Sequence, residues 1–126
     1  LIVDDEIFNI VVIENFCKSL GIATEKAFNG QEALDKLKSC FKDGLSPIKL
    51  VFMDVNMPIM DGYQATANIK EMISQGEIED LEIVGVTAYV ARDKIVRGFK
   101  SGMSEIVNKP LSKTVLSDVL KRYAII

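Results

Sequence analysis

The sequence has 126 residues, of which 48% are hydrophobic and 26% charged, and its formal net charge is −3. This size and composition are typical of one globular domain with one core, and they argue against a disordered chain and against a broad basic surface for nucleic acid. The sequence contains no histidine, which excludes a Ser-His-Asp triad, a Cys-His pair and histidine metal ligands.

Five repeats of a strand followed by a helix account for the whole chain. Apolar residues at helical spacing predict the helices, short apolar runs predict the strands, and Gly, Asn and Pro mark the turns. The first apolar run is shorter than an average strand of about five residues, so we expect a first strand whose beginning is truncated. In chain order we expect a strand at 1–3, a helix at 6–20, a strand at 22–28, a helix at 30–44, a strand at 50–53, a helix at 63–74, a strand at 81–86, a helix at 91–100, a strand at 104–107 and a helix at 113–123.

Local signals refine the helices. Ser112 is a favourable N-cap for the last helix. Gly98 lies inside the expected helix at 91–100, where glycine costs about 1 kcal/mol relative to alanine, so we expect this helix to be the least stable. The expected buried faces comprise Ala33, Leu34, Leu37, Cys40 and Phe41 in the second helix, Ile69, Met72 and Ile73 in the third, and Val115, Leu116, Val119, Leu120 and Tyr123 in the last.

Alternating strands and helices predict an α/β fold, with a parallel sheet covered by helices on both faces. Cys17 and Cys40 lie among apolar neighbours and outside any metal-ligand spacing, so we expect core thiols in a reducing compartment, with a disulfide as the alternative. No apolar stretch approaches the roughly 20 residues needed to cross a bilayer, and no secretory signal opens the sequence. We therefore expect a soluble domain, whatever the location of its parent protein.

Polar residues stand at the carboxyl ends of four expected strands. Asp4 and Asp5 follow the first strand, Asp54 the third, Thr87 the fourth and Lys109 the fifth. Each has an ordinary explanation when taken alone: Asp5 suits a helix N-cap, Thr87 a strand, and Lys109 a solvated surface. Because the carboxyl edge of an open parallel sheet is where ligands bind, their shared position favours one common site.

The chemistry of this site follows from its charges. Three carboxylates brought together must take up protons or hold a cation, and oxygen ligands without Cys or His suit Mg²⁺, with Mn²⁺ as a second choice. An oxygen of Asp54 would then be free to act as a nucleophile toward a phosphoryl group. The Lys109 ammonium and the Thr87 hydroxyl could contact the phosphoryl oxygens. The Lys109-Pro110 bond can be cis or trans, and the sequence does not decide between them.

Four segments closely resemble the response-regulator receiver family: LIVDDE at 1–6, MDVNMPIMDG at 53–62, VTA at 86–88 and NKP at 108–110. The resemblance implies a flavodoxin-like, doubly wound, five-stranded parallel sheet of order 2-1-3-4-5 with five helices, and one receiver domain over 1–126. It implies a signalling domain that catalyses its own phosphorylation and dephosphorylation. The implied roles are phosphoacceptor for Asp54, metal ligands for Asp4, Asp5, Asp54 and the Asn56 main-chain carbonyl, phosphoryl contacts for Thr87 and Lys109, and influence on the phosphoryl lifetime for Asn56 and Tyr89.

The resemblance also implies a partner and a setting. A phosphohistidine donor must come from a histidine kinase core or a histidine phosphotransfer domain, because this chain has no histidine. The sequence at 53–62 is most similar to that of receivers attached to hybrid histidine kinases, so a hybrid histidine kinase is the favoured origin. We expect a cytoplasmic domain without direct contact to nucleic acid or membrane, even if its parent protein is anchored in a membrane. The first helix, and the face of the fourth helix, fifth strand and fifth helix, are the expected partner surfaces.

One position departs from the family pattern. Where the family often has Tyr or Phe, whose ring turns inward on activation, this chain has Ile106. We expect phosphorylation to survive and the coupling of the threonine to an aromatic ring to be altered.

Two other functions remain open. A metal-dependent phosphatase usually needs a second Asp two residues after its nucleophile, where Asn56 stands, and a pseudo-receiver that only binds partners is disfavoured by the complete acidic cluster.

Overall fold

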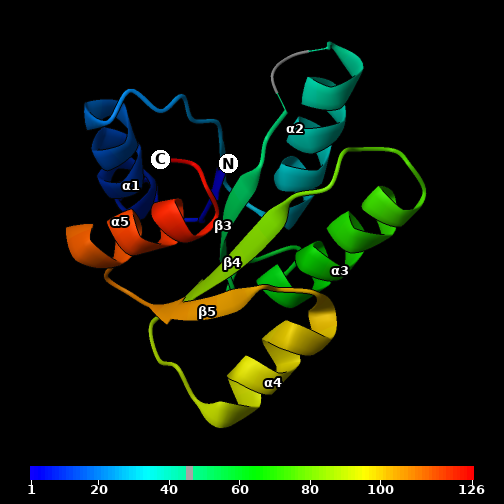
Figure 1. The fold of residues 1–126 in the computed structure, drawn as a ribbon. Coiled ribbons are helices and arrows are strands. Elements are labelled where there is room, and N and C mark those ends of the chain that lie inside the picture. Colours follow the sequence, from blue (N-terminus) through cyan, green and yellow to red (C-terminus); the bar gives the residue numbers. More distant parts are fainter. Residues whose placement is uncertain (45–46) are drawn as a thin grey trace.

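The computed structural model describes residues 1–44 and 47–126 of the protein. Its strands and helices alternate along the chain as expected from the sequence (Figure 1). The elements are β1 (Ile2–Val3), α1 (Ile7–Ser19), β2 (Lys26–Ala27), α2 (Gly30–Lys42), β3 (Leu50–Asp54), α3 (Gly62–Ser74), β4 (Glu82–Thr87), α4 (Arg92–Ser101), β5 (Glu105–Asn108) and α5 (Lys113–Arg122).

The sheet has the order β2-β1-β3-β4-β5, and every neighbouring pair is parallel, which confirms the expected fold class. β3 lies in the middle and all five of its residues are buried. β2 is much shorter than the predicted range 22–28. The reason is its partner: β2 pairs only with the two residues of β1, in the register Ile2 with Lys26 and Val3 with Ala27.

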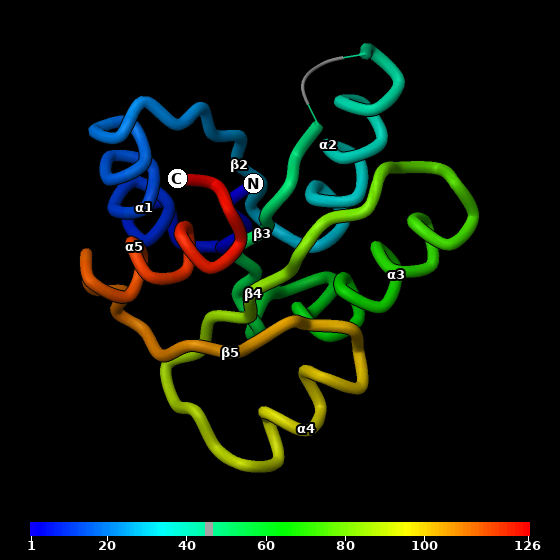
Figure 2. The backbone as a smooth tube through the Cα atoms, viewed as in Figure 1, coloured from blue at the N-terminus to red at the C-terminus, as the bar shows by residue number. Residues whose placement is uncertain are grey.

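Helices cover both faces of the sheet. Figure 1 shows α1 and α5 side by side on one face and α2 and α3 on the other, with α4 beside β5; Figure 2 traces the same path of the chain from strand to helix and back. Successive residues of a strand point to opposite faces. Val51 and Met53 of β3 therefore join the core under α2 and α3, whereas Leu50 and Phe52 join the core under α1 and α5.

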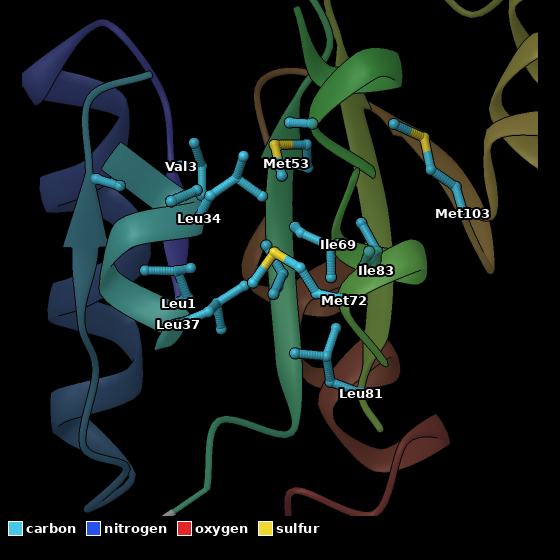
Figure 3. Close-up of a cluster of buried hydrophobic side chains, with 14 of the residues drawn as sticks. Leu1, Val3, Leu34, Leu37, Met53, Ile69, Met72, Leu81, Ile83 and Met103 are labelled. Atoms are coloured by element: carbon cyan, nitrogen blue, oxygen red, sulfur yellow. The ribbon is translucent and has the colours of Figure 1, made fainter. Parts of the chain in front are cut away.

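Two apolar layers result from this alternation. The layer shown in Figure 3 packs Leu34 and Leu37 of α2 and Ile69 and Met72 of α3 against the sheet. The second layer packs α1 and α5 against the opposite face through Ile10, Ile13, Cys17, Leu116, Val119 and Leu120. The expected burial of both cysteines as free thiols is confirmed. No helix in residues 1–44 or 47–126 combines the length and apolar character that crossing a membrane requires.

Two residues expected in the core are exposed. Phe41 is 46% exposed, because the last turn of α2 extends beyond the start of β3 (Figure 1). Val115 is 36% exposed, because it stands in the first turn of α5 at the margin of the buried stripe that begins at Leu116. The predicted cap of α5 is confirmed, since the Val115 N–H donates a hydrogen bond of 3.1 Å to the Ser112 hydroxyl.

Glycine inside α4 has a packing role that the sequence did not reveal. Gly98 is buried, and a Cβ at this position would overlap the Cδ1 atom of Ile106 and lie 3.0 Å from its Cγ1 atom. The Ile106 side chain of β5 thus occupies the space beside Gly98 of α4. Lower stability of α4 stays a prediction, and the packing of Ile106 against Gly98 acts against it.

Candidate functional site

Acidic side chains from two neighbouring strands meet at the carboxyl edge of the sheet. β1 and β3 pair in the register Val3 with Met53, which places the residues that follow, Asp4 and Asp54, side by side. Asp4, Asp5 and Asp54 each offer a carboxylate oxygen, and these atoms lie within 4.8 Å of one another. Asp4 and Asp54 are buried, with exposed fractions of 5% and 3%, whereas Asp5 is exposed. The expected meeting of the three carboxylates is therefore observed.

Lys109 brings a positive charge into this cluster. Its Nζ atom lies 3.0 Å from Oδ1 of Asp54 and 3.1 Å from Oδ2 of Asp4. Burial disfavours the charged ammonium, but the hydrogen bonds to Asp54 and Asp4 outweigh burial and raise the pKa of Lys109 above its ordinary value. The peptide bond between Lys109 and Pro110 is cis. Lys109 thus stays charged and holds the two buried carboxylates together.

The carboxyl of Asp54 is short of positive charge. Burial, reinforced by the charge of Asp4, raises the pKa of Asp54 to about 6, although Lys109 and a hydrogen bond from the Asn56 backbone N–H lower it. One lysine therefore does not compensate the buried carboxylates. The cluster offers only hard oxygen donors, which are the donors that Mg²⁺, Mn²⁺ and Ca²⁺ prefer. These residues fit a divalent cation.

The alternative that Asp5 caps the first helix is wrong. The N-cap of α1 is Glu6, which makes no side-chain cap hydrogen bond. The Glu6 backbone N–H instead donates to Oδ1 of Asp4 at 2.9 Å, because the chain turns into the helix directly above that carboxylate. Asp4 is thereby oriented by a backbone donor and by Lys109, and Asp5 is left available at the rim.

Thr87 is buried at the end of β4 and is held close to Lys109. The Lys109 N–H donates to the Thr87 carbonyl oxygen at 2.7 Å, and the Val90 N–H donates to Oδ1 of Asn108 at 3.0 Å. The Thr87 hydroxyl makes only long contacts, of 3.4 Å to the backbone of Tyr89 and 3.4 Å to Nζ of Lys94. β5 therefore positions the end of β4 and the loop that follows it, while the Thr87 hydroxyl is weakly bound.

Lys94 was missed by the sequence reasoning. A signal was present, because Lys94 is the third residue of α4, where the helix dipole disfavours a cation. The sequence analysis gave this residue no role. The structure places its ammonium beside Thr87 and 5.9 Å from the centre of the Tyr89 ring.

The loop after Asp54 is folded tightly against the strand. A Cβ on Gly62 would meet the carbonyl oxygen of Asp54 and lie 2.8 Å from Cα of Val55, so only glycine fits there. Asp61 caps α3 by accepting a hydrogen bond of 2.8 Å from the Gln64 N–H. In the same loop Ile59 has a positive φ of 71°, a strained backbone conformation for a β-branched residue. Residues 54–62 therefore include both residues that shape the turn and Asp54 of the acidic cluster.

Comparisons with known proteins agree with this geometry. The family model described as response regulator receiver domain matches residues 1–121. The sensor histidine kinase RcsC of Salmonella typhimurium is 35% identical over 124 residues, which cover 98% of this chain and 12% of that kinase. Curated relatives of this kind are sensor and hybrid histidine kinases, and the chain spans only 7% to 14% of the length of four of them.

Solved structures show the same fold. The receiver domain of Saccharomyces cerevisiae Ssk1, solved with the histidine phosphotransfer protein Ypd1, has a TM-score of 0.87 at 24% identity, and the match covers 98% of this chain and 86% of that one. CheY of Borrelia burgdorferi, solved as a CheX-CheY-BeF3-Mg²⁺ complex, has a TM-score of 0.82 at 26% identity and covers 97% of this chain and 86% of that one. The chain belongs to the response regulator receiver domain family of two-component signalling.

Proposed function

We propose that Asp54 accepts a phosphoryl group from a phosphohistidine and that this modification switches the domain. The observation that carries the proposal is the position of the Asp54 carboxylate, buried beside Asp4 and 3.0 Å from the ammonium of Lys109. An oxygen of Asp54 would attack the phosphorus atom, so that an O–P bond forms while the P–N bond of the donor breaks. The imidazole nitrogen keeps the electron pair of that bond, and the product is an acyl phosphate on Asp54.

Two further side chains would hold the transferred group. Phosphoryl transfer has a loose transition state, so the protein mainly positions the group and neutralises its oxygens. Lys109 would turn from the Asp54 carboxylate to a phosphoryl oxygen, and the weakly bound Thr87 hydroxyl would donate to another. The domain would in this way catalyse its own phosphorylation and dephosphorylation, without acting on a separate substrate.

A divalent cation would be held by Asp4, Asp5, Asp54 and the main-chain carbonyl of Asn56. Mg²⁺ fits the oxygen donors, and Mn²⁺ is the second choice. When bound, the ion would neutralise charge on the phosphoryl oxygens. Support comes from the carboxylate oxygens within 4.8 Å of one another and from the Borrelia CheX-CheY complex, which contains Mg²⁺ and BeF3.

The donor would be a histidine kinase core or a histidine phosphotransfer domain. The chain contains no histidine, so the phosphohistidine belongs to a partner or to another part of the same protein. The complex of the Ssk1 receiver with Ypd1 supports a phosphotransfer partner, and the kinases among the curated relatives support a hybrid histidine kinase as the parent. We infer one receiver domain over the 126 residues, acting in the cytoplasm.

Phosphorylation by acetyl phosphate and Mg²⁺, followed by intact-mass measurement, tests the proposal. We expect one added phosphoryl group, which is lost in Asp54→Asn and in the presence of EDTA. Asp118→Asn is the matched control, because Asp118 is exposed on α5, and it should be modified like the original chain.

Two outcomes would contradict the proposal. Rapid turnover of many small phosphate esters would indicate a metal-dependent phosphatase. Failure to bind Mg²⁺ in a titration, together with an unmodified mass, would indicate a pseudo-receiver that only binds partners.

A further inference from the structure

A second lysine reaches the site from α4. The Nζ atom of Lys94 lies 3.4 Å from the hydroxyl oxygen of Thr87 and 5.9 Å from the centre of the Tyr89 ring. Both contacts are long for their type, and Lys94 is half-buried. The ammonium is therefore beside the site but makes no strong interaction with residues 1–44 or 47–126.

A count of formal charges shows that the phosphorylated site needs one further cation. Before modification, the three carboxylates of Asp4, Asp5 and Asp54 are balanced by Lys109 together with one divalent cation. A phosphoryl group replaces the single negative charge of Asp54 with two, so the same partners leave one negative charge uncompensated. A buried charge without a counter-charge is unfavourable, and the nearest further cation on a described contact is Lys94.

The position of Lys94 in its helix points the same way. It is the third residue of α4, whose N-cap, Ala91, makes no side-chain cap hydrogen bond. A cation in the first turn opposes the helix dipole, so the dipole of α4 does not favour lysine there. A nearby anion would remove that disadvantage.

We propose that Lys94 is the second cation of the phosphorylated site, where its ammonium leaves the face of Tyr89 and binds a phosphoryl oxygen beside Thr87. The inference rests on the proposed phosphorylation of Asp54. Movement of Lys94 carries the first turn of α4 toward the site. The domain thus links phosphorylation to α4 through a charge at position 94, where other receivers use an aromatic ring at the position of Ile106.

Beryllofluoride tests the proposal, since on a carboxylate it adds one negative charge as a phosphoryl group does. Its binding to the whole chain with Mg²⁺ is measured by isothermal titration calorimetry and by ¹⁹F NMR, and Mg²⁺ binding is measured separately. Lys94→Met keeps the apolar stem and removes the charge, and Lys94→Arg restores the charge. Lys100→Met is the matched control, because Lys100 is an exposed lysine in the last turn of the same helix.

We expect Lys94→Met to weaken Mg²⁺-dependent beryllofluoride binding about tenfold, as for loss of one charge-assisted hydrogen bond, and high salt to narrow this difference. Mg²⁺ binding alone should be unchanged, Lys94→Arg should bind like the original chain, and so should Lys100→Met. Equal binding by Lys94→Met and the original chain would overturn the role of Lys94, as would an equal loss in Lys100→Met. If the original chain binds Mg²⁺ but no beryllofluoride, the proposed function itself fails, and the role of Lys94 with it.

Discussion

Met53 and Asp54 are neighbours in β3 and equally buried, but burial has opposite consequences for them. Met53 is 0% exposed and lies in the apolar layer under α2 and α3, where burial stabilises the fold. Asp54 is 3% exposed at the rim of the sheet, where burial raises the pKa of its carboxyl to about 6 and disfavours its charged form. The core is therefore arranged for stability, whereas the rim keeps a buried carboxyl group whose charged form reduces stability.

The core should lose the most stability on truncation. Ile69 is 0% exposed and packs in the layer shown in Figure 3. Ile69→Ala removes buried methyl groups and leaves a cavity, so we expect the free energy of unfolding to fall by about 4 kcal/mol. Urea denaturation followed by circular dichroism measures the change. Ile73→Ala, at a half-buried position of the same helix, should lose clearly less, and an equal loss would contradict the assigned packing.

The junction between core and rim should come next. Gly62→Ala places a Cβ against the backbone of Asp54 and Val55, so β3 or α3 must shift. We expect a loss of about 3 kcal/mol, in the upper range for overpacking, measured in the same denaturation assay. Gly30→Ala is the control at the first residue of α2, because its Cβ would meet only side-chain atoms of Ala65 and Met60, at 3.0 Å. A smaller loss in Gly62→Ala than in Gly30→Ala would argue against the close approach.

Removing the charge of Asp54 at the rim should raise the free energy of unfolding, whereas the two preceding substitutions lower it. The folded protein holds the proton of Asp54 up to about pH 6, whereas an unfolded aspartate releases it near the ordinary pKa of 3.8. Because the folded state binds more protons in this window, the stability of the metal-free protein should fall as the pH rises from 4 to 6. At pH 7.5 Asp54→Asn should be more stable than the original chain by about 2 kcal/mol, and by less at pH 4.

Thermal unfolding in EDTA at several pH values measures this effect. Addition of Mg²⁺ should then stabilise the original chain and leave Asp54→Asn nearly unchanged, because a ligand stabilises the state that binds it. A variant that is less stable than the original chain at pH 7.5 without metal would show that the ion pair with Lys109 outweighs the cost of burial.

The smallest expected effect lies outside both regions. Ser112→Ala removes the acceptor for the Val115 N–H at the start of α5, so the free energy of unfolding should fall by about 1 kcal/mol. Ser117→Ala, within the same helix, is the control and should cause no loss, since alanine is the better helix former. Equal stability of the two variants would mean that the cap contributes nothing.

The alternating strands and helices could be predicted from the sequence because their signals are repeated in every element, whereas the strand order came from the family resemblance. Apolar spacing and turn residues located all ten elements, and the position of polar residues at strand ends located the rim. Local patterns failed where the outcome depends on neighbours. Phe41 and Val115 fit their helical stripes but are exposed, and β2 is limited by the length of its partner.

The site was predicted in part for the same reason. Asp4 directly follows β1, and Asp54 and Thr87 end β3 and β4, so topology alone brings them together. Lys94 lies inside a helix, and no pattern of spacing tells where the end of a lysine side chain reaches. The cap of α1 depends on which of several adjacent acidic residues turns inward, and Asp4 does so.

The Ile106 side chain of β5 fills the space beside Gly98 of α4, so the strand and the helix are packed tightly together at this point. Turning the Ile106 side chain away would open a void against the glycine backbone, which disfavours its rotation. A displacement of α4 must therefore drag the adjoining edge strand with it. A protein that docks on either element would sense the movement of both.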